Sequence, residues 1–178
     1  MKDLDQSPLG TAINPERMER ILERDKQEIE LEREMEELSK EPVYTGRGKD
    51  RTQAVRKISR KYYEIANGMV EDAMYSEAIE LYTKSIAVLK KGGNRNAVDS
   101  YFNRAITLAM MGYPKMALDD LKIVSRTKPP KADVYFVKGQ IFESLGREKL
   151  AERMYKRSLD IDPNFYRAAH SLANIHLR

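Results

Sequence analysis

The sequence repeats itself, and this repetition constrains the fold more than any other feature of the chain. The segments SEAIELYTKSI (76–86), KMALDDLKIVS (115–125) and KLAERMYKRSL (149–159) align without gaps. Spacings of 39 and then 34 residues separate three alanines, Ala78, Ala117 and Ala151. The same two spacings relate upstream positions, which are Tyr62, Tyr101 and Tyr135, and also Ala66, Ala105 and Gly139. A fixed period of this length indicates an array of stacked supersecondary units.

Each unit is expected to contain two helices. Gly112 and Gly146 fall between the paired helices, and Ala73 occupies the matching place in the first unit. The repeated alanines lie where the second helix crosses the first, so a larger side chain would force the two helix axes apart. Each helical hairpin leaves one apolar face that the next hairpin buries. The sequence therefore predicts an all-α fold that is stable as a stack.

A period of 34 residues with two helices, a small residue in each helix and a closing proline resembles the tetratricopeptide repeat. Pro129 and Pro163 are the closing prolines, and Lys90 stands at this place in the first unit. The resemblance covers about two thirds of the chain and implies an α-solenoid with three repeats, at about 59–92, 98–131 and 132–165. A closing helix is expected at 166–178, with four residues facing inward: Ala169, Leu172, Ala173 and Ile175.

The N-terminal part of the chain differs in charge from the rest. Residues 1–41 hold 7 basic and 13 acidic residues, whereas residues 42–178 hold 25 basic and 15 acidic ones. The run Asn14-Pro15-Glu16 predicts a helix start, with Asn14 as the cap. A separate charged helix is therefore expected at 14–41, after a disordered segment at 1–13. We interpret it as a solvated helix, because its apolar stripe changes register; a coiled coil or a docking helix is the alternative.

A basic linker that leads into the next helix is expected at 42–54, ahead of a repeat domain at 55–178. Residues 42–61 carry 7 basic residues and one acidic residue. Such a segment can mark contact with nucleic acid. We interpret it instead as a solvated linker, because no aromatic platform accompanies the charges.

Several classes of function are disfavoured by what the chain contains. It has no cysteine, no apolar core of a signal peptide and no apolar run of membrane-spanning length, so a soluble, intracellular, cytoplasmic protein is expected. His170 and His176 are six residues apart, which is not the spacing of metal ligands on a helix, and we interpret both as surface residues. The adjacent acids Asp119 and Asp120 are interpreted as a solvated face rather than a catalytic pair. We expect no enzymatic activity, no metal and no cofactor.

The resemblance implies that the first helices of successive repeats line a concave surface where short or extended peptides bind. Transferred onto this chain, that surface gives a candidate groove of ten residues: Tyr63, Asn67, Phe102, Asn103, Ile106, Met110, Asp133, Phe136, Val137 and Gln140. Its floor is apolar and aromatic, and its charge is set by acidic residues, Glu64, Asp99, Asp133 and Glu143. The expected partner is a peptide or helix segment of a protein that is apolar and basic.

One subclass of these repeats, found in co-chaperones, binds acidic chaperone tails through a carboxylate clamp of Lys, Asn, Asn, Lys and Arg. The two clamp asparagines are kept here as Asn67 and Asn103. The clamp cations are replaced by Tyr63, Asp133 and Val137. Because charge-assisted hydrogen bonds dominate carboxylate binding, the chain is not expected to use this clamp.

Three functions follow from these patterns. The first is a non-enzymatic scaffold or adaptor, co-chaperone-like or an assembly factor, that binds a protein segment in the groove. The alternative is a structural subunit docked through its N-terminal helix. An RNA-associated helical repeat is less favoured, a membrane partner is not expected, and the oligomeric state is left open.

Overall fold

The computed structural model describes residues 14–40, 48–91 and 97–177, which contain helices and no strand. The helices follow one another along the chain as α1 (Pro15–Lys40), α2 (Gly48–Glu71), α3 (Tyr75–Lys91), α4 (Val98–Met110), α5 (Pro114–Val124), α6 (Ala132–Ser144), α7 (Glu148–Ile161) and α8 (Tyr166–His176). The chain divides into two compact units, Met1–Glu41 and Pro42–Arg178. The prediction of an all-α fold with a separate N-terminal helix is confirmed.

Helix α1 begins where the capping pattern predicts. The side-chain oxygen of Asn14 accepts a hydrogen bond from the backbone N–H of Glu16 at 2.9 Å, and Pro15 is the first helical residue. This cap satisfies one of the backbone donors that a helix start leaves without a partner. The segment 1–13, for which we expected disorder, lies outside the described residues.

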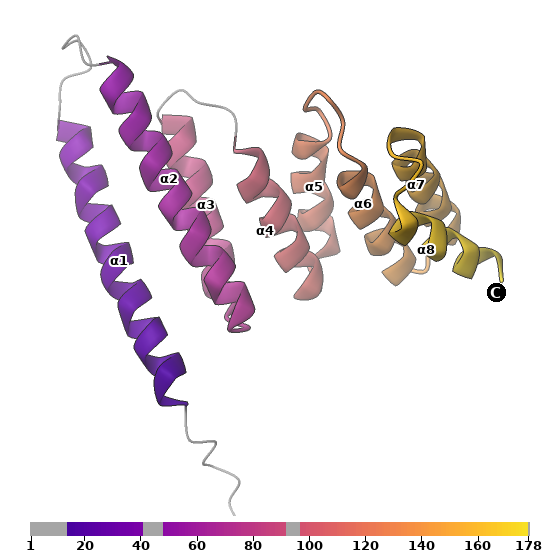
Figure 1. The fold of residues 1–178 in the computed structure, drawn as a ribbon, viewed down its shortest axis with the longest axis horizontal. Helices are drawn as coiled ribbons and strands as arrows, with labels where there is room; N and C mark the ends of the chain where they lie inside the picture. Colours follow the sequence, from indigo (N-terminus) through magenta and orange to yellow (C-terminus); the bar gives the residue numbers. More distant parts are fainter. Residues whose placement is uncertain (1–13, 41–47, 92–96, 178) are drawn as a thin grey trace, which may run out of the picture. The chain divides into compact units, whose positions relative to one another are not determined.

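The second unit is a linear array of helical hairpins. Helix α2 packs on α3, α4 on α5, and α6 on α7, and α8 packs on α7 at the end of the array (Figure 1). The first helices of successive hairpins also touch, α2 with α4 and α4 with α6. These contacts give the predicted solenoid of three repeats and a closing helix. Helix α2 begins at Gly48, so the last seven residues of the segment assigned to a linker and helix start, 48–54, are helical.

The three hairpin turns share one backbone structure. Gly112 and Gly146 have positive φ angles of 80° and 68°, and Ala73 has a φ of 61° at the matching place. In the second hairpin, the N–H of Tyr113 bonds to the carbonyl of Leu108 at 2.8 Å. The N–H of Gly112 bonds to the carbonyl of Ala109 at 3.1 Å. These two bonds form a Schellman motif, whose left-handed residue is usually glycine because glycine has no Cβ that would clash with the backbone.

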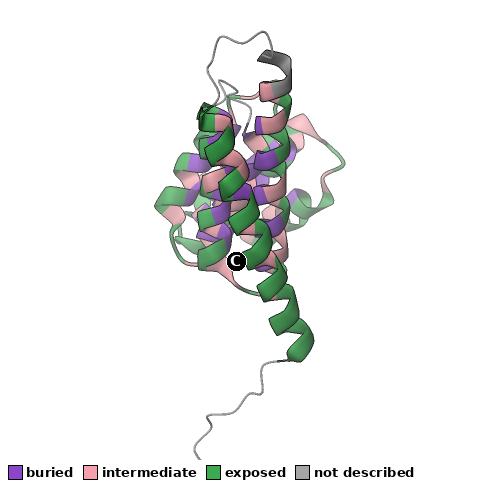
Figure 2. Cartoon of the chain, turned by 90° about the vertical axis from the view of Figure 1, so that its left-hand side faces the viewer, coloured by how far each residue is buried: buried purple, intermediate pink, exposed green. Residues whose placement is uncertain are grey.

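Small side chains lie at the helix crossings. Ala78, Ala117 and Ala151 are each 0% exposed. Ala66 and Ala105 of the first helices are also fully buried, and a Cβ added to Gly139 would overlap the ring of Tyr155. Buried positions gather on the helix sides that face other helices, whereas exposed positions cover the outside (Figure 2). The small residues of the repeat therefore set how closely the helices of a hairpin approach.

Ala117→Leu is expected to lower the free energy of unfolding by about 1–3 kcal/mol, because the added atoms have no space at the crossing of α4 and α5. The control is Lys115→Ala, which changes an exposed residue of the same helix. Thermal unfolding followed by circular dichroism measures both variants. Equal midpoints would show that Ala117 does not lie at a tight crossing.

The inward face of the closing helix differs from the predicted one. The residues that face the array are Phe165, Ala168, Leu172 and Ile175, and Ala168 is 0% exposed. Ala169 and Ala173 are exposed, so our assignment of these two residues to the inward face is wrong. The helix is rotated by about one residue because Phe165, just before its first turn, packs against Phe136 with ring centroids 5.4 Å apart.

Candidate peptide-binding groove

Seven of the ten predicted groove residues line one cavity between α4 and α6. The cavity has a volume of about 360 Å³, and the seven residues are Phe102, Ile106, Met110, Asp133, Phe136, Val137 and Gln140. Phe102, Ile106 and Met110 follow one face of α4, since they are spaced by four residues. Met110 is 57% exposed, so the cavity opens with apolar surface at its edge.

Phe136 belongs to the protein core more than to the groove. It is 3% exposed, and its ring centroid lies 5.7 Å from that of Tyr155. It forms a buried cluster with Tyr155, Ala151 and Ala168. Phe136 therefore supports the floor of the cavity but offers little surface to a ligand.

Arg167 of α8 also lines this cavity and is not among the ten predicted groove residues. Its guanidinium carbon lies 4.6 Å from the centroid of the Phe136 ring, which is a cation–π contact. Asp133 lies at the same cavity and is exposed. The cavity therefore has an apolar floor, with one cation and one anion at its edges. Arg167 precedes the buried Ala168, so its place at the cavity could be predicted only if the buried face of α8 were known.

The other three predicted residues, Tyr63, Asn67 and Asn103, form a hydrogen-bonded cluster. The amide nitrogen of Asn103 donates to the Asn67 side-chain oxygen at 2.8 Å and to the Tyr63 hydroxyl at 3.1 Å. The Tyr82 hydroxyl donates to the same Asn67 oxygen at 2.6 Å. Burial raises the pKa of Tyr82 to about 12, so this phenol remains a hydrogen-bond donor at pH values where an exposed tyrosine ionises. Since an Asn amide carries two N–H donors, both donors of Asn103 are used inside the protein.

No tight binding to an acidic chaperone C-terminal peptide is expected from this cluster. Asn103 has no free amide donor, and the three positions of the clamp cations hold Tyr63, Asp133 and Val137. Calorimetric titration of the chain with such a peptide should show no saturable heat at micromolar concentrations. Low-micromolar binding that is lost in Asn67→Ala and Asn103→Ala would contradict this expectation.

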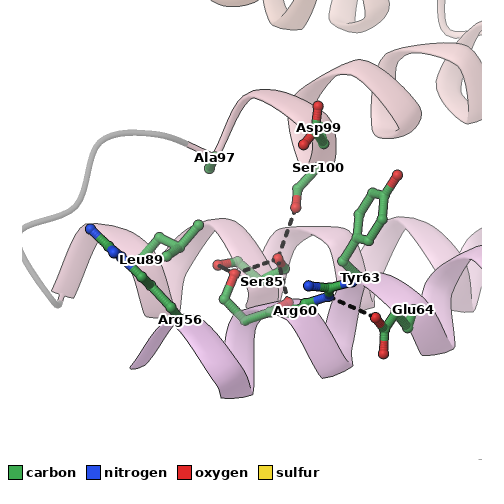
Figure 3. A pocket seen from close by; sticks show the side chains of 10 residues that line it. Arg56, Arg60, Tyr63, Glu64, Ser85, Leu89, Ala97, Asp99 and Ser100 are labelled. Atoms are coloured by element: carbon green, nitrogen blue, oxygen red, sulfur yellow. Dashed lines mark hydrogen bonds and ion pairs between the residues drawn. The ribbon is translucent and has the colours of Figure 1, made fainter. Parts of the chain in front are cut away.

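A second cavity, of about 670 Å³, lies between α2, α3 and α4 (Figure 3). Its floor contains buried serines that were not among the predicted site residues. The Ser85 hydroxyl lies 2.8 Å from that of Ser59 and 2.8 Å from that of Ser100. Ser85 also donates to the carbonyl of Ser59 at 2.9 Å, and Ser158 donates to the carbonyl of Ala132 at 2.9 Å. Ser85 and Ser158 occupy the same position of the repeat, and so do their partners Ser59 and Ala132. The buried serine could therefore have been found by aligning the repeats.

Most acidic residues of the predicted groove already have partners. Glu64 pairs with Arg60 at 2.9 Å, and Asp99 lies 3.6 Å from Lys131. Glu143 accepts a hydrogen bond from the Tyr155 hydroxyl at 2.7 Å. For Asp133, the described part of the chain shows neither an ion pair nor a hydrogen bond of its carboxylate.

The acidic pair Asp119–Asp120 is not a solvated face as we predicted. Asp119 is exposed, but Asp120 is 5% exposed and its two oxygens accept hydrogen bonds from Arg104 at 2.8 Å each. The prediction for Asp120 is wrong because α5 turns this residue toward α4. His170 and His176 are exposed, as expected. Among the described residues, no group of three metal-ligating side chains is found, and no helix has the length and apolar character to cross a membrane.

Comparison with known proteins identifies the repeat. Residues 132–165 match the family model described as tetratricopeptide repeat. The chain is 29% identical over 127 residues to DnaJ homolog subfamily C member 7 of Homo sapiens, a match that covers 68% of this chain and 24% of that protein. The chain thus spans about a quarter of the length of the curated relatives it matches.

Solved structures share the fold. The first TPR of Spaghetti (RPAP3), bound to the HSP90 peptide SRMEEVD, has a TM-score of 0.59 at 22% identity and covers 67% of this chain and 90% of that one. The Sgt2 TPR domain from Aspergillus fumigatus has a TM-score of 0.58 at 20% identity and covers 66% of this chain and 76% of that one. Tetratricopeptide repeats are generally non-catalytic interaction modules. The array from α2 to α8 therefore has the fold of tetratricopeptide repeat domains, and its residues 132–165 match the family model of the repeat itself.

Proposed function

We propose that this protein is a scaffold or adaptor whose groove between α4 and α6 binds an apolar peptide or helix segment of another protein. The observation that carries the proposal is the cavity of about 360 Å³ with Phe102, Ile106, Met110 and Val137 on its walls. Concave sites with apolar walls and a few polar groups at the edge are the usual form of a binding site. Helices α4 and α6 each present one face to the cavity, which suits a segment that lies along the groove.

The charges at the cavity edge suggest what should flank the apolar residue of the ligand. Asp133 is exposed and can pair with a Lys or Arg of the ligand, as the sequence analysis expected. Arg167 lies over the Phe136 ring and can form an ion pair with an acidic group of the ligand. The apolar walls supply most of the binding free energy, at roughly 25 cal/mol per Å² of apolar surface buried, and the edge charges set the orientation.

The test is a peptide library displayed against the immobilised chain, with affinities of selected peptides measured by fluorescence anisotropy. Phe102→Ala combined with Met110→Ala should weaken binding at least about tenfold, because full burial of each side chain contributes roughly 1.5–3 kcal/mol. Phe136 is unsuitable for this test, because it is 3% exposed and its loss would open the core.

The matched control is Tyr113→Ala combined with Leu145→Ala, which removes two apolar side chains that are 51% and 43% exposed and do not line the cavity. Selection of apolar peptides that bind the control and the unmodified chain equally would support the groove. If the Phe102 and Met110 variant keeps its fold and its affinity, the groove is not the binding site.

A further inference from the structure

The outward face of α5 carries an apolar pair in the middle of the array. Met116 is 55% exposed and Ile123 is 43% exposed. The two residues are seven positions apart, so they lie on the same face of α5, about 10.5 Å apart along its axis. Hairpins flank α5 on both sides, so this exposure does not arise from the end of the array.

The other repeats do not have this pair. The aligned segments place Glu77 and Lys84 of α3 at the positions of Met116 and Ile123. In α7 the same positions hold Leu150 and Arg157. The fold itself accepts charged side chains at both positions, so the apolar pair of α5 is not required by packing. Exposed apolar side chains that share one face and are not required by packing can mark an interaction site.

Basic side chains lie next to the apolar pair, on one side of it. Lys115, Lys122 and Arg126 are exposed residues of α5 and of the turn that follows it, and Asp119 is the exposed acid among them. Within the part of the chain that the structure describes, these three basic residues form no ion pair. A partner with acidic residues beside two apolar ones would gain both burial and charge complementarity.

Helix α1 has acidic residues beside two exposed apolar ones. It contains ten acidic and six basic residues, a net charge of −4. Leu22 is 54% exposed and Ile29 is 68% exposed, and these residues are also seven positions apart. Asp25 lies between them on the same face and is exposed. Two helices with apolar residues at the same seven-residue spacing can pack side by side along a common seam.

We propose that α1 of a second copy of this chain docks on the outward face of α5. Leu22 and Ile29 of the docked helix lie against Met116 and Ile123, and the acidic residues of α1 meet the basic ones of α5. The outward face of α5 lies outside the groove residues, so this interface is independent of the proposed peptide binding. The proposed interface gives α1 a partner surface. Peptide binding in the groove does not involve this helix.

The test is sedimentation velocity of the full chain across a series of concentrations. The unmodified chain should self-associate as its concentration rises, and the association should weaken at high salt because exposed charges are screened. Met116→Glu with Ile123→Lys installs the residues that the first repeat carries and leaves the net charge unchanged. Leu22→Lys with Ile29→Glu removes the apolar pair of α1 and also leaves the net charge unchanged. Each pair should lower the association constant about a hundredfold, because each removes two buried apolar side chains.

The control pair is Tyr113→Glu with Leu145→Lys, which replaces exposed apolar residues outside the interface and should change the association constant by no more than about twofold. Circular dichroism shows whether each variant keeps its fold. A chain that stays monomeric at every concentration overturns the proposal. So does an association that the α1 pair leaves unchanged, since α5 would then bind a different segment.

Discussion

Replacing Asp120 by alanine is expected to lower the free energy of unfolding by about 2–4 kcal/mol, because it removes the carboxylate from a partly buried cation that it binds through two hydrogen bonds. The Asp120 side chain is 7% exposed and that of Arg104 is 18% exposed. Two hydrogen bonds of 2.8 Å join them, from Nε and Nη2 of Arg104 to the two carboxylate oxygens. A third, also 2.8 Å, runs from Nη1 of Arg104 to Thr83. The guanidinium thus ties α3, α4 and α5 together, and its orientation depends on the carboxylate.

Urea unfolding followed by circular dichroism measures this effect. The matched control is Asp119→Ala, which removes the neighbouring carboxylate from an exposed position and should change the stability by no more than about 0.5 kcal/mol. If the two variants unfold at the same urea concentration, the Arg104–Asp120 pair does not stabilise the fold.

Tyr155→Ala is expected to destabilise the protein by about 3–5 kcal/mol through the cavity that it opens. Tyr155 is 0% exposed and packs between α6 and the closing helix, in the buried cluster with Phe136, Ala151 and Ala168. Its ring also occupies the space that a side chain on Gly139 would need. Loss of the ring removes contacts on both sides, so the docking of α8 should weaken together with the hairpin of α6 and α7.

The control for this substitution is Tyr155→Phe, which keeps the ring and removes the hydrogen bond of 2.7 Å to Glu143. It should cost about 1–2 kcal/mol. Hydrogen exchange of α8 amides, measured together with thermal unfolding, distinguishes local loosening of the closing helix from global destabilisation. Equal stabilities of the Ala and Phe variants would show that the ring is not a packing element of the core.

The α4 side of the cavity could be predicted from the sequence, because its residues occupy fixed positions of the repeat. The resemblance to the repeat family placed Phe102, Ile106 and Met110 on the concave face of one helix, and this face lines the cavity. The roles of Phe136 and Arg167 were not predictable, because they depend on how α8 is rotated against α6. That rotation is set by the contact between Phe165 and Phe136, and the sequence shows both residues without showing that they meet.

Asp120 shows the same limit for charge. A carboxylate beside another carboxylate on a helix is usually solvated, and the sequence carried no sign that Arg104, 16 residues earlier, faces it. The period of the sequence by itself determined the helix count of the array, the hairpin turns and the crossings at Ala78, Ala117 and Ala151, because stacked repeats require the same small residues at the same places. Only the tertiary structure decided which polar groups are buried and paired, because hydrogen-bond partners from different helices are chosen by packing geometry rather than by local sequence.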